Sequence, residues 1–581
     1  MKKIQVSLLA LLVSLGLLTS SNAAVNSVGD PGRSWAQPND WSLGEHIQQF
    51  IDSPPNEMVS YLVRSQFSYL AESDPTCESI SDPDCAGQEL NYSAVLPRCL
   101  SEVDSNCTSD FGIIDESGVK RSANFQRYFP ERAQNQFKGD SVMGVPDGVA
   151  GSLFSLPQAP HDGGDKYHLA VVLSGGVSAS GVVTSPTFEV RIHPVQLETS
   201  AYLTSSGDQR DAGWAEITDK NTGKVRWGIQ GVGYDGTQYC VASSWREKLC
   251  AQKYAFPADL KFYVTVRTSQ EPGGWMHGRI SSPDIQISKG SRFSTIELSG
   301  YPIAVPTIYK KYRYTEMPSD LKKWYDVKRG GYIPSCGNGE DYCAGGRSGP
   351  SPDPLNRNVI ISPAPWDPFG MDQFKLWIPY VDDKATALPS FWSVRSLSVA
   401  EMENASACFS DKSKITGIVT TNSTQYSAGP PKFDKSEGTL GYQVAAPHFG
   451  TKGEVFKGSY DLVMRSEVAR CVYGFSKAPI QASLSITSSD GSQQVATTVI
   501  GERDGWLYLT AKNFEFSAPV IKAKLTQEGP APAPTATSAG TPSQIQKPKT
   551  KMTITCVRGS SKKKVTAVKP TCPKGYKKVV R

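Results

Sequence analysis

The sequence is poor in histidine and lacks the short motifs that mark several common catalytic sites. Its 581 residues include six histidines, and they contain no G-x-S-x-G, no H-E-x-x-H and no glycine-rich phosphate loop. The sequence therefore does not indicate an α/β-hydrolase serine, a zinc protease or a nucleotide-binding loop. C-x-x-C pairs are also missing, which argues against a structural zinc site.

One segment, PHDGGDKYH, gathers residues that could hold a metal. Its candidate ligands are His161, Asp162, Asp165 and His168. The same segment is typical of a polar turn at Gly163-Gly164 that leads into a strand. We favour the turn, and we predict no metal, no cofactor and no catalytic residue.

A hydrolase is the alternative that these absences leave open. Gly139-Asp140-Ser141 resembles the start of a serine-esterase motif, but its surroundings show neither a strand-to-helix turn nor a partner histidine. Two of the 56 acidic residues could still pair in space for glycoside hydrolysis. An extracellular hydrolase acting on polysaccharide or ester substrates therefore stays the second hypothesis.

Long apolar runs are missing after the first 23 residues. The chain begins with Lys2 and Lys3, continues with an apolar run over 4–18, and then offers Ser21-Asn22-Ala23 as a small-residue cleavage site. This order is typical of a secretory signal peptide, and the run is shorter than the roughly 20 residues of a membrane-spanning helix. We predict an exported protein with no transmembrane span once the signal is removed.

Acidic residues are missing from the C-terminal end. Residues 547–581 contain ten lysines and two arginines and no acid. When these twelve and the two lysines of residues 1–23 are set aside, 47 basic residues remain against 56 acidic ones, a net charge of −9. The sequence thus predicts an acidic body that carries a strongly basic tail.

The twelve cysteines indicate disulfides, because an even number in an exported chain is typical of a disulfide framework. Most of them occur as close neighbours, which favours sequential pairing. The expected pairs are Cys77–Cys85, Cys99–Cys107, Cys240–Cys250, Cys336–Cys343, Cys408–Cys471 and Cys556–Cys572.

Alternating apolar residues indicate a fold of the mainly β class. The runs 260–267 and 480–486 alternate between apolar and more polar residues, whereas the best short helix is MDQFKLWI at 371–378. We expect antiparallel sandwich-like domains with irregular disulfide-stapled loops, a Pro/Ala/Thr linker and a small C-terminal β-hairpin. The expected regions are a signal peptide at 1–23, a β-rich N-terminal region at 24–300, an irregular connector with a short helix at 301–390, a β domain at 391–527, a flexible linker at 528–551 and a basic disulfide hairpin at 552–581.

Two segments resemble parts of a known group of proteins. The tail TITCVRGSSKKKVTAVKPTCPKGYKK, from Thr553, is similar to a C-terminal element of uncharacterised exported surface proteins of actinobacteria, and DLVMRSEVARCVYGFSKAPI, from Asp461, is similar to a segment that recurs in them. The resemblance covers residues 390–581. It implies an exported protein associated with a Gram-positive envelope, and it brings no catalytic residues.

These observations predict a secreted cell-surface protein with a binding or adhesive body and an envelope-binding tail. The expected partner of the tail is an anionic envelope polymer or lipid surface, because Coulombic attraction needs no particular shape. Export makes nucleic acid a weaker candidate, and the sequence does not indicate the body's ligand. The expected envelope-binding residues are Lys562, Lys563, Lys564, Lys569, Lys574, Lys577, Lys578 and Arg581.

Overall fold

A computed structural model describes most of the chain. The described residues are 44–52, 58–65, 76–131, 136–184, 186–199, 214–218, 225–229, 240–244, 247–326, 359–367, 370–476, 480–487, 493–494, 497–516, 520–527, 552–559, 561–567 and 571–579. The predicted signal peptide and linker, the expected pair Cys336–Cys343, and the tail residues Lys569 and Arg581 lie outside them.

The predicted β class is confirmed, since strands make up 53% of the structure and helices 9%. The two alternating runs form strands β14 (Lys261–Thr268) and β25 (Ile480–Thr487). On β14, Phe262, Val264 and Val266 are buried as the alternation predicts. Tyr263 is buried on the opposite face, where its hydroxyl donates to Asp110 at 2.7 Å, and the alternation does not predict this.

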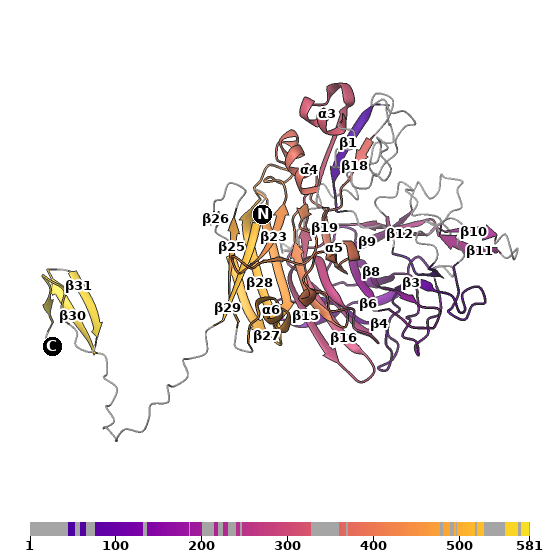
Figure 1. Ribbon diagram of the computed structural model, residues 1–581, viewed down its shortest axis with the longest axis horizontal. Coiled ribbons are helices and arrows are strands. Elements are labelled where there is room, and N and C mark those ends of the chain that lie inside the picture. Colours follow the sequence, from indigo (N-terminus) through magenta and orange to yellow (C-terminus); the bar gives the residue numbers. More distant parts are fainter. Residues whose placement is uncertain are drawn as a thin grey trace, which may run out of the picture. The chain divides into compact units, whose positions relative to one another are not determined.

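Three packed sheets form most of the described part of the body (Figure 1). The first contains β5 (Lys120–Ser122), β4 (Cys107–Ile114), β14, β16 (Ser294–Ala304) and the second half of β15 (Gly274–Lys289). The central sheet runs from β6 (Asn124–Tyr128) through β7 (Ser152–Ser155), β8 (Lys166–Val177), β9 (Thr187–Thr199), β19 (Ser390–Ser396), the first half of β15, β20 (Ile415–Thr421), β24 (Lys457–Arg465) and β28 (Trp506–Glu515) to β27 (Thr497–Arg503).

Shorter strands extend these layers. β3 (Leu90–Val95) and β2 (Tyr61–Arg64) extend the sheet beside β8, and β13 (Leu249–Lys253) and β12 (Cys240–Ser244) extend it beside β9. The third sheet contains β21 (Gln425–Tyr426), β22 (Lys432–Asp434), β23 (Thr439–Ala445), β29 (Val520–Gln527), β25 and β26 (Gln493–Gln494). A separate hairpin is formed by β10 (Trp214–Thr218) and β11 (Val225–Ile229).

The central sheet is buried on both faces. Neighbouring residues of β24 face different cores: Val463 packs with the first sheet and Leu462 with the third. All seven residues of β20 are buried, which fits its run of β-branched residues. Alternation of apolar and polar residues disappears in such strands, because neither face meets water.

A small three-stranded sheet and short helices complete the body. In this sheet β1 (Glu45–Phe50) lies between β17 (Ile308–Arg313), which is antiparallel to it, and β18 (Val359–Ile361), which is parallel. The predicted short helix is confirmed as α4 (Gly370–Trp377), whose Met371, Phe374 and Trp377 pack against Phe50 and Ile308. The remaining helical segments are η2 (Tyr314–Glu316), α3 (Ser319–Asp326), η3 (Ile378–Val381), α5 (Val399–Met402), η4 (Ala407–Phe409) and α6 (Ser466–Tyr473).

The expected boundaries at 300 and 390 do not separate compact units. Residue 300 lies inside β16, and β19, which begins at Ser390, pairs with β9, β15 and β16 of the N-terminal region. The pairing of distant strands therefore joins the three expected regions into one unit, Met1–Gln527. The second unit is Glu528–Arg581.

Candidate functional site

The C-terminal unit forms the predicted stapled hairpin. β30 (Met552–Arg558) and β31 (Ser561–Ala567) pair antiparallel around Gly559, whose φ of 58° suits glycine in a tight turn. Cys556 is bonded to Cys572 as predicted. A third strand that the sequence did not indicate, β32 (Lys577–Lys578), pairs with the other edge of β30.

Strand register assigns the lysines of this sheet to two faces. Lys563 and Lys578 stand opposite Cys556 on either side of β30, so these three residues share one face. Lys562 and Lys577 stand opposite Val557 and therefore share the other face. Successive residues of a strand point to opposite faces, which is why adjacent lysines separate in this way.

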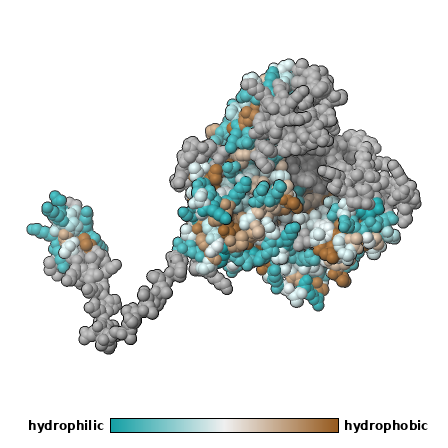
Figure 2. Space-filling model, viewed as in Figure 1, coloured by the Kyte–Doolittle hydropathy of each residue, from teal (hydrophilic) through white to brown (hydrophobic). Residues whose placement is uncertain are grey.

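The lysines of this unit face solvent. Lys562, Lys563, Lys564, Lys574, Lys577 and Lys578 are all exposed, as is Arg558. Figure 2 shows hydrophilic side chains over much of the described part of this unit. Six of the eight expected envelope-binding residues are therefore accessible, within a stretch of sequence that contains no acid.

The disulfides of the body follow the sequential pattern where they are described. Cys77 is bonded to Cys85, Cys99 to Cys107, and Cys408 to Cys471. Cys250 is also disulfide-bonded, and it lies on β13 beside the neighbouring strand β12, which begins at Cys240. The pairing of Cys240 with Cys250 remains a prediction, because the side chain of Cys240 lies outside the described part of the structure.

The segment PHDGGDKYH forms the favoured polar turn. The Nε2 atom of His161 lies 2.9 Å from the carbonyl oxygen of Lys166, and Nδ1 accepts from the backbone N–H of Gly163. His168 is buried on β8, with Nε2 3.0 Å from the carbonyl oxygen of Phe129. The two histidines thus bind different carbonyl groups, and the described residues include no group of three metal-ligating side chains.

The Gly139-Asp140-Ser141 segment is also a turn. Asp140 Oδ1 accepts from the backbone N–H groups of Val142 and Met143 at 2.8 and 3.0 Å. The carboxylate therefore stabilises the local backbone, as aspartate commonly does in turns.

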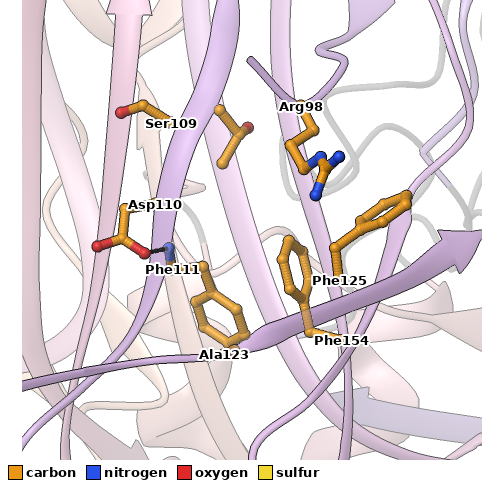
Figure 3. Close-up of a pocket in the computed structure, with 8 residues that line it drawn as sticks. Arg98, Ser109, Asp110, Phe111, Ala123, Phe125 and Phe154 are labelled. Carbon is orange, nitrogen blue, oxygen red and sulfur yellow. Dashed lines mark hydrogen bonds between the residues drawn. The ribbon is translucent and has the colours of Figure 1, made fainter. Parts of the chain in front are cut away.

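One pocket of the body adjoins the Cys99–Cys107 loop. It has a volume of about 130 Å³ and lies between β4, β6 and β7. Its lining includes Arg98, Ser109, Asp110, Phe111, Phe125 and Phe154. Figure 3 shows the three phenylalanine rings close together, with Phe154 between the other two. No pattern in the sequence points to these residues, because they come from separate strands.

A positive charge stands over the aromatic wall of this pocket. The guanidinium carbon of Arg98 lies 4.8 Å from the centre of the Phe125 ring. Among the described residues no carboxylate forms an ion pair with Arg98. A guanidinium in this state can bind an anionic group while its flat face stays on the aromatic ring.

The opposite wall contains a β-bulge. Thr108 and Asp110 have partners on β14, whereas Ser109 between them has none. Figure 3 shows the side chains of Ser109 and Asp110 on the same side, away from the phenylalanine rings. β-bulges redirect side chains in this way and are frequent beside binding sites.

Asp110 also belongs to a pair of carboxylates on the outer face of the first sheet. Asp110, Thr265 and Glu297 stand opposite one another on β4, β14 and β16. The backbones of Asp110 and Glu297 are therefore separated by two strand spacings, each of about 4.8 Å. Tyr263 donates to Asp110, and Lys120 lies 2.5 Å from Glu297, so each carboxylate already has a partner.

A buried polar cluster joins the central and third sheets. The His277 ring stacks on Tyr426 with the ring centres 4.0 Å apart, and the guanidinium of Arg279 lies 4.9 Å from the same Tyr426 ring. Burial, and then the nearby Arg279, hold the pKa of His277 well below its usual value. Arg395 donates to both oxygens of Glu401 at 2.8 Å. This ion pair joins β19 to α5, and removal of one partner would leave the other charge without its compensation.

Asp461 shows a raised pKa, a feature that often marks catalytic acids. Its side chain is buried on β24, and burial is the main cause of the raised pKa. The carboxylate accepts hydrogen bonds from Thr510, Thr420 and the backbone N–H of Ser282 at 2.6, 3.1 and 3.0 Å. These contacts join β24 to the bulge in β15, so the group has a structural role.

An aspartate–histidine pair lies nearer the surface, and no local sequence pattern indicates it. Asp383 Oδ2 lies 2.5 Å from His448 Nδ1, and Asp383 Oδ1 accepts from the backbone N–H of His448. Asp382 and Asp383 both have positive φ, at 53° and 52°. The pair fastens two loops that are 65 residues apart, a separation that hides it in the sequence.

No helix in the described ranges is both long and apolar enough to cross a membrane. The chain matches no protein-family model, and comparison with curated proteins and with solved structures found no similar protein. The basic hairpin and the Arg98 pocket are therefore the features of this chain on which a functional conclusion can be based.

Proposed function

We propose that this chain is a secreted cell-surface protein whose basic C-terminal unit attaches it to an anionic envelope polymer or lipid surface. Its body then has a binding or adhesive role. The pattern of a signal peptide, the disulfides and the resemblance to exported actinobacterial proteins support export.

The observation that carries the proposal is the exposure of six lysines in a small disulfide-bonded unit, five of them on the strands of its sheet. Lysines in this number are not needed for a core, since Cys556 is the one buried residue among those of this unit whose burial the structure describes. A teichoic-type wall polymer or an anionic lipid surface supplies the opposite charge. The segment 528–551, rich in proline and alanine, is typical of a spacer.

A binding role for the body rests on the Arg98 pocket. The pocket combines an aromatic wall with a guanidinium that has no carboxylate partner among the described residues. Ligand sites commonly pair an apolar wall with a few placed polar groups. The extracellular hydrolase remains the alternative, and Asp110 with Glu297 is the pair of acids that it would use.

Cell fractionation tests the attachment. Deletion of 547–581 should release the protein from the envelope into the medium. Replacement of all ten tail lysines by glutamine should have the same effect, whereas replacement by arginine should keep the protein attached. Attachment of the intact protein should weaken steeply with salt, because the Debye length falls from about 10 Å at 0.1 M to about 3 Å at 1 M.

Two results would contradict attachment by charge. One is retention of the truncated protein on the envelope, and the other is an intact protein that resists washing with molar salt. Hydrolysis of a polysaccharide or ester panel by the purified protein, abolished by Asp110→Asn, would favour the hydrolase.

A further inference from the structure

The two faces of the C-terminal sheet differ in what covers them. On the Cys556 face, the chain from Thr571 to Tyr576 returns over the sheet and is fixed there by the Cys556–Cys572 bond. Cys556 is 0% exposed as a result. The Val557 face has no such cover in the described part of the unit, and Thr555 and Val557 remain partly exposed.

Contacts of the returning segment confirm which face it covers. The ammonium group of Lys563 lies 5.4 Å from the centre of the Tyr576 ring. Gly575, with φ of 89°, places its Cα hydrogens against the Arg558 side chain, since a Cβ there would lie 3.6 Å from a guanidinium nitrogen. Lys563 and Arg558 on this face are thus in contact with the returning chain, while Lys578 on the same face is exposed.

The open face carries three lysines and no other charge among its described residues. Lys562 and Lys564 are two residues apart on β31, which places them about 7 Å apart, and Lys577 stands in the row of Lys562 across β30. Val557 and Thr555 lie between them. The result is a flat, regular group of point charges.

We infer that the anion bound by this unit lies on the open face, against Lys562, Lys564 and Lys577, and that it presents a series of phosphate groups. Lysine binds phosphate as a point charge, and this binding does not need the planar fork by which arginine matches carboxylates and phosphates alike. The one described arginine of the unit, Arg558, lies on the covered face beside Gly575. This inference rests on the proposed attachment and adds a face and a ligand chemistry to it.

The chain offers a matched pair of variants for the test. Lys562→Gln with Lys577→Gln removes the row that flanks Val557 on the open face. Lys563→Gln with Lys578→Gln removes the adjacent row that flanks Cys556 on the covered face. Both variants remove two charges from exposed positions on the same two strands, so they differ in the face alone.

The measurement uses the full mature chain and long-chain inorganic polyphosphate as the probe, with affinity followed across a salt series. The variant Lys562→Gln with Lys577→Gln should bind polyphosphate at least tenfold more weakly. The slope of its log affinity against log salt should fall by about two, as expected for the loss of two phosphate contacts. The affinity of the variant Lys563→Gln with Lys578→Gln for polyphosphate should change by less than threefold. Vesicles of phosphatidylglycerol and phosphatidylcholine form a second arm, which distinguishes a lipid source of phosphate from a polymer.

Each other outcome of these measurements contradicts either the choice of face, the phosphate chemistry or the whole inference. Equal losses in the two variants would overturn the choice of face, while attachment by charge would stand if fractionation supports it. Equally tight binding of polygalacturonate would overturn the phosphate chemistry. Absence of binding to both polyphosphate and the vesicles would overturn the inference, and cell fractionation then decides the proposed attachment separately. Disulfide mapping and circular dichroism verify that both variants keep the hairpin.

Discussion

Cys408 and Cys471 are 63 residues apart in the sequence, and their disulfide joins η4 to α6 beside the third sheet. The bond closes a long loop, whereas Cys99 and Cys107 close a loop of eight. In the chain-entropy picture, a longer closed loop removes more freedom from the unfolded chain. The two bonds should therefore differ in what they contribute to stability.

We predict that replacing both Cys408 and Cys471 by serine lowers the free energy of unfolding by about 4 kcal/mol, against about 2.5 kcal/mol for Cys99 and Cys107. Denaturant unfolding of both variants under non-reducing conditions measures this. The reverse order would show that strain or structure in the unfolded chain outweighs loop length.

The staple of the C-terminal unit should decide whether its sheet is ordered. Replacing Cys556 and Cys572 by serine should cost this unit about 3 kcal/mol, and a hairpin of this size is marginal in water without such support. We expect amide protection in β30 and β31 to be lost and trypsin to cleave after Lys562–Lys564, while the unfolding of the body is unchanged. Unchanged protection would mean that the strands alone suffice.

Acid should destabilise the body through its buried histidines. Burial lowers the pKa of His168 to about 4. In the unfolded chain the pKa is near 6.5, so between pH 6.5 and about 4 the unfolded state binds the proton and the folded state does not. Stability is therefore complete above pH 6.5 and falls as the pH decreases.

For His168 the loss at pH 5 is about 2 kcal/mol relative to pH 7.5. The difference in unfolding free energy between the wild type and His168→Gln should shrink by this amount over that range. It should be constant above pH 7.5. A difference that does not change with pH would contradict the account.

The buried pair Arg395–Glu401 should respond differently from a surface pair. The Glu401 side chain is 1% exposed and also accepts from the Ser398 backbone N–H, so Glu401→Ala should cost about 3 kcal/mol by leaving Arg395 without its partner. Arg395→Met with Glu401→Leu should recover part of this loss. The exposed pair Lys457–Glu515 is the control, and Glu515→Gln should change stability by less than about 1 kcal/mol. Similar costs for the two pairs would contradict the role of burial.

Local patterns in the sequence determined much of the secondary structure. Alternation at 260–267 and 480–486 predicts β14 and β25, because one face of each strand is drier than the other. Close spacing of cysteines predicts the short disulfides, since neighbours in the chain meet readily. The composition of the tail and its two cysteines predicts the basic hairpin.

Tertiary structure alone decided how these elements combine. The bulge near Ser282 lets β15 belong to two sheets, and this joins regions that the sequence suggested were separate. The Arg98 pocket and the Asp383–His448 pair bring together residues from distant segments. Composition gives the charge of the tail, but only pairing across β30 places Lys577 and Lys578, neighbours in the chain, on opposite faces. The physical reason is that strand register and long-range packing depend on contacts between segments far apart, which local sequence does not specify.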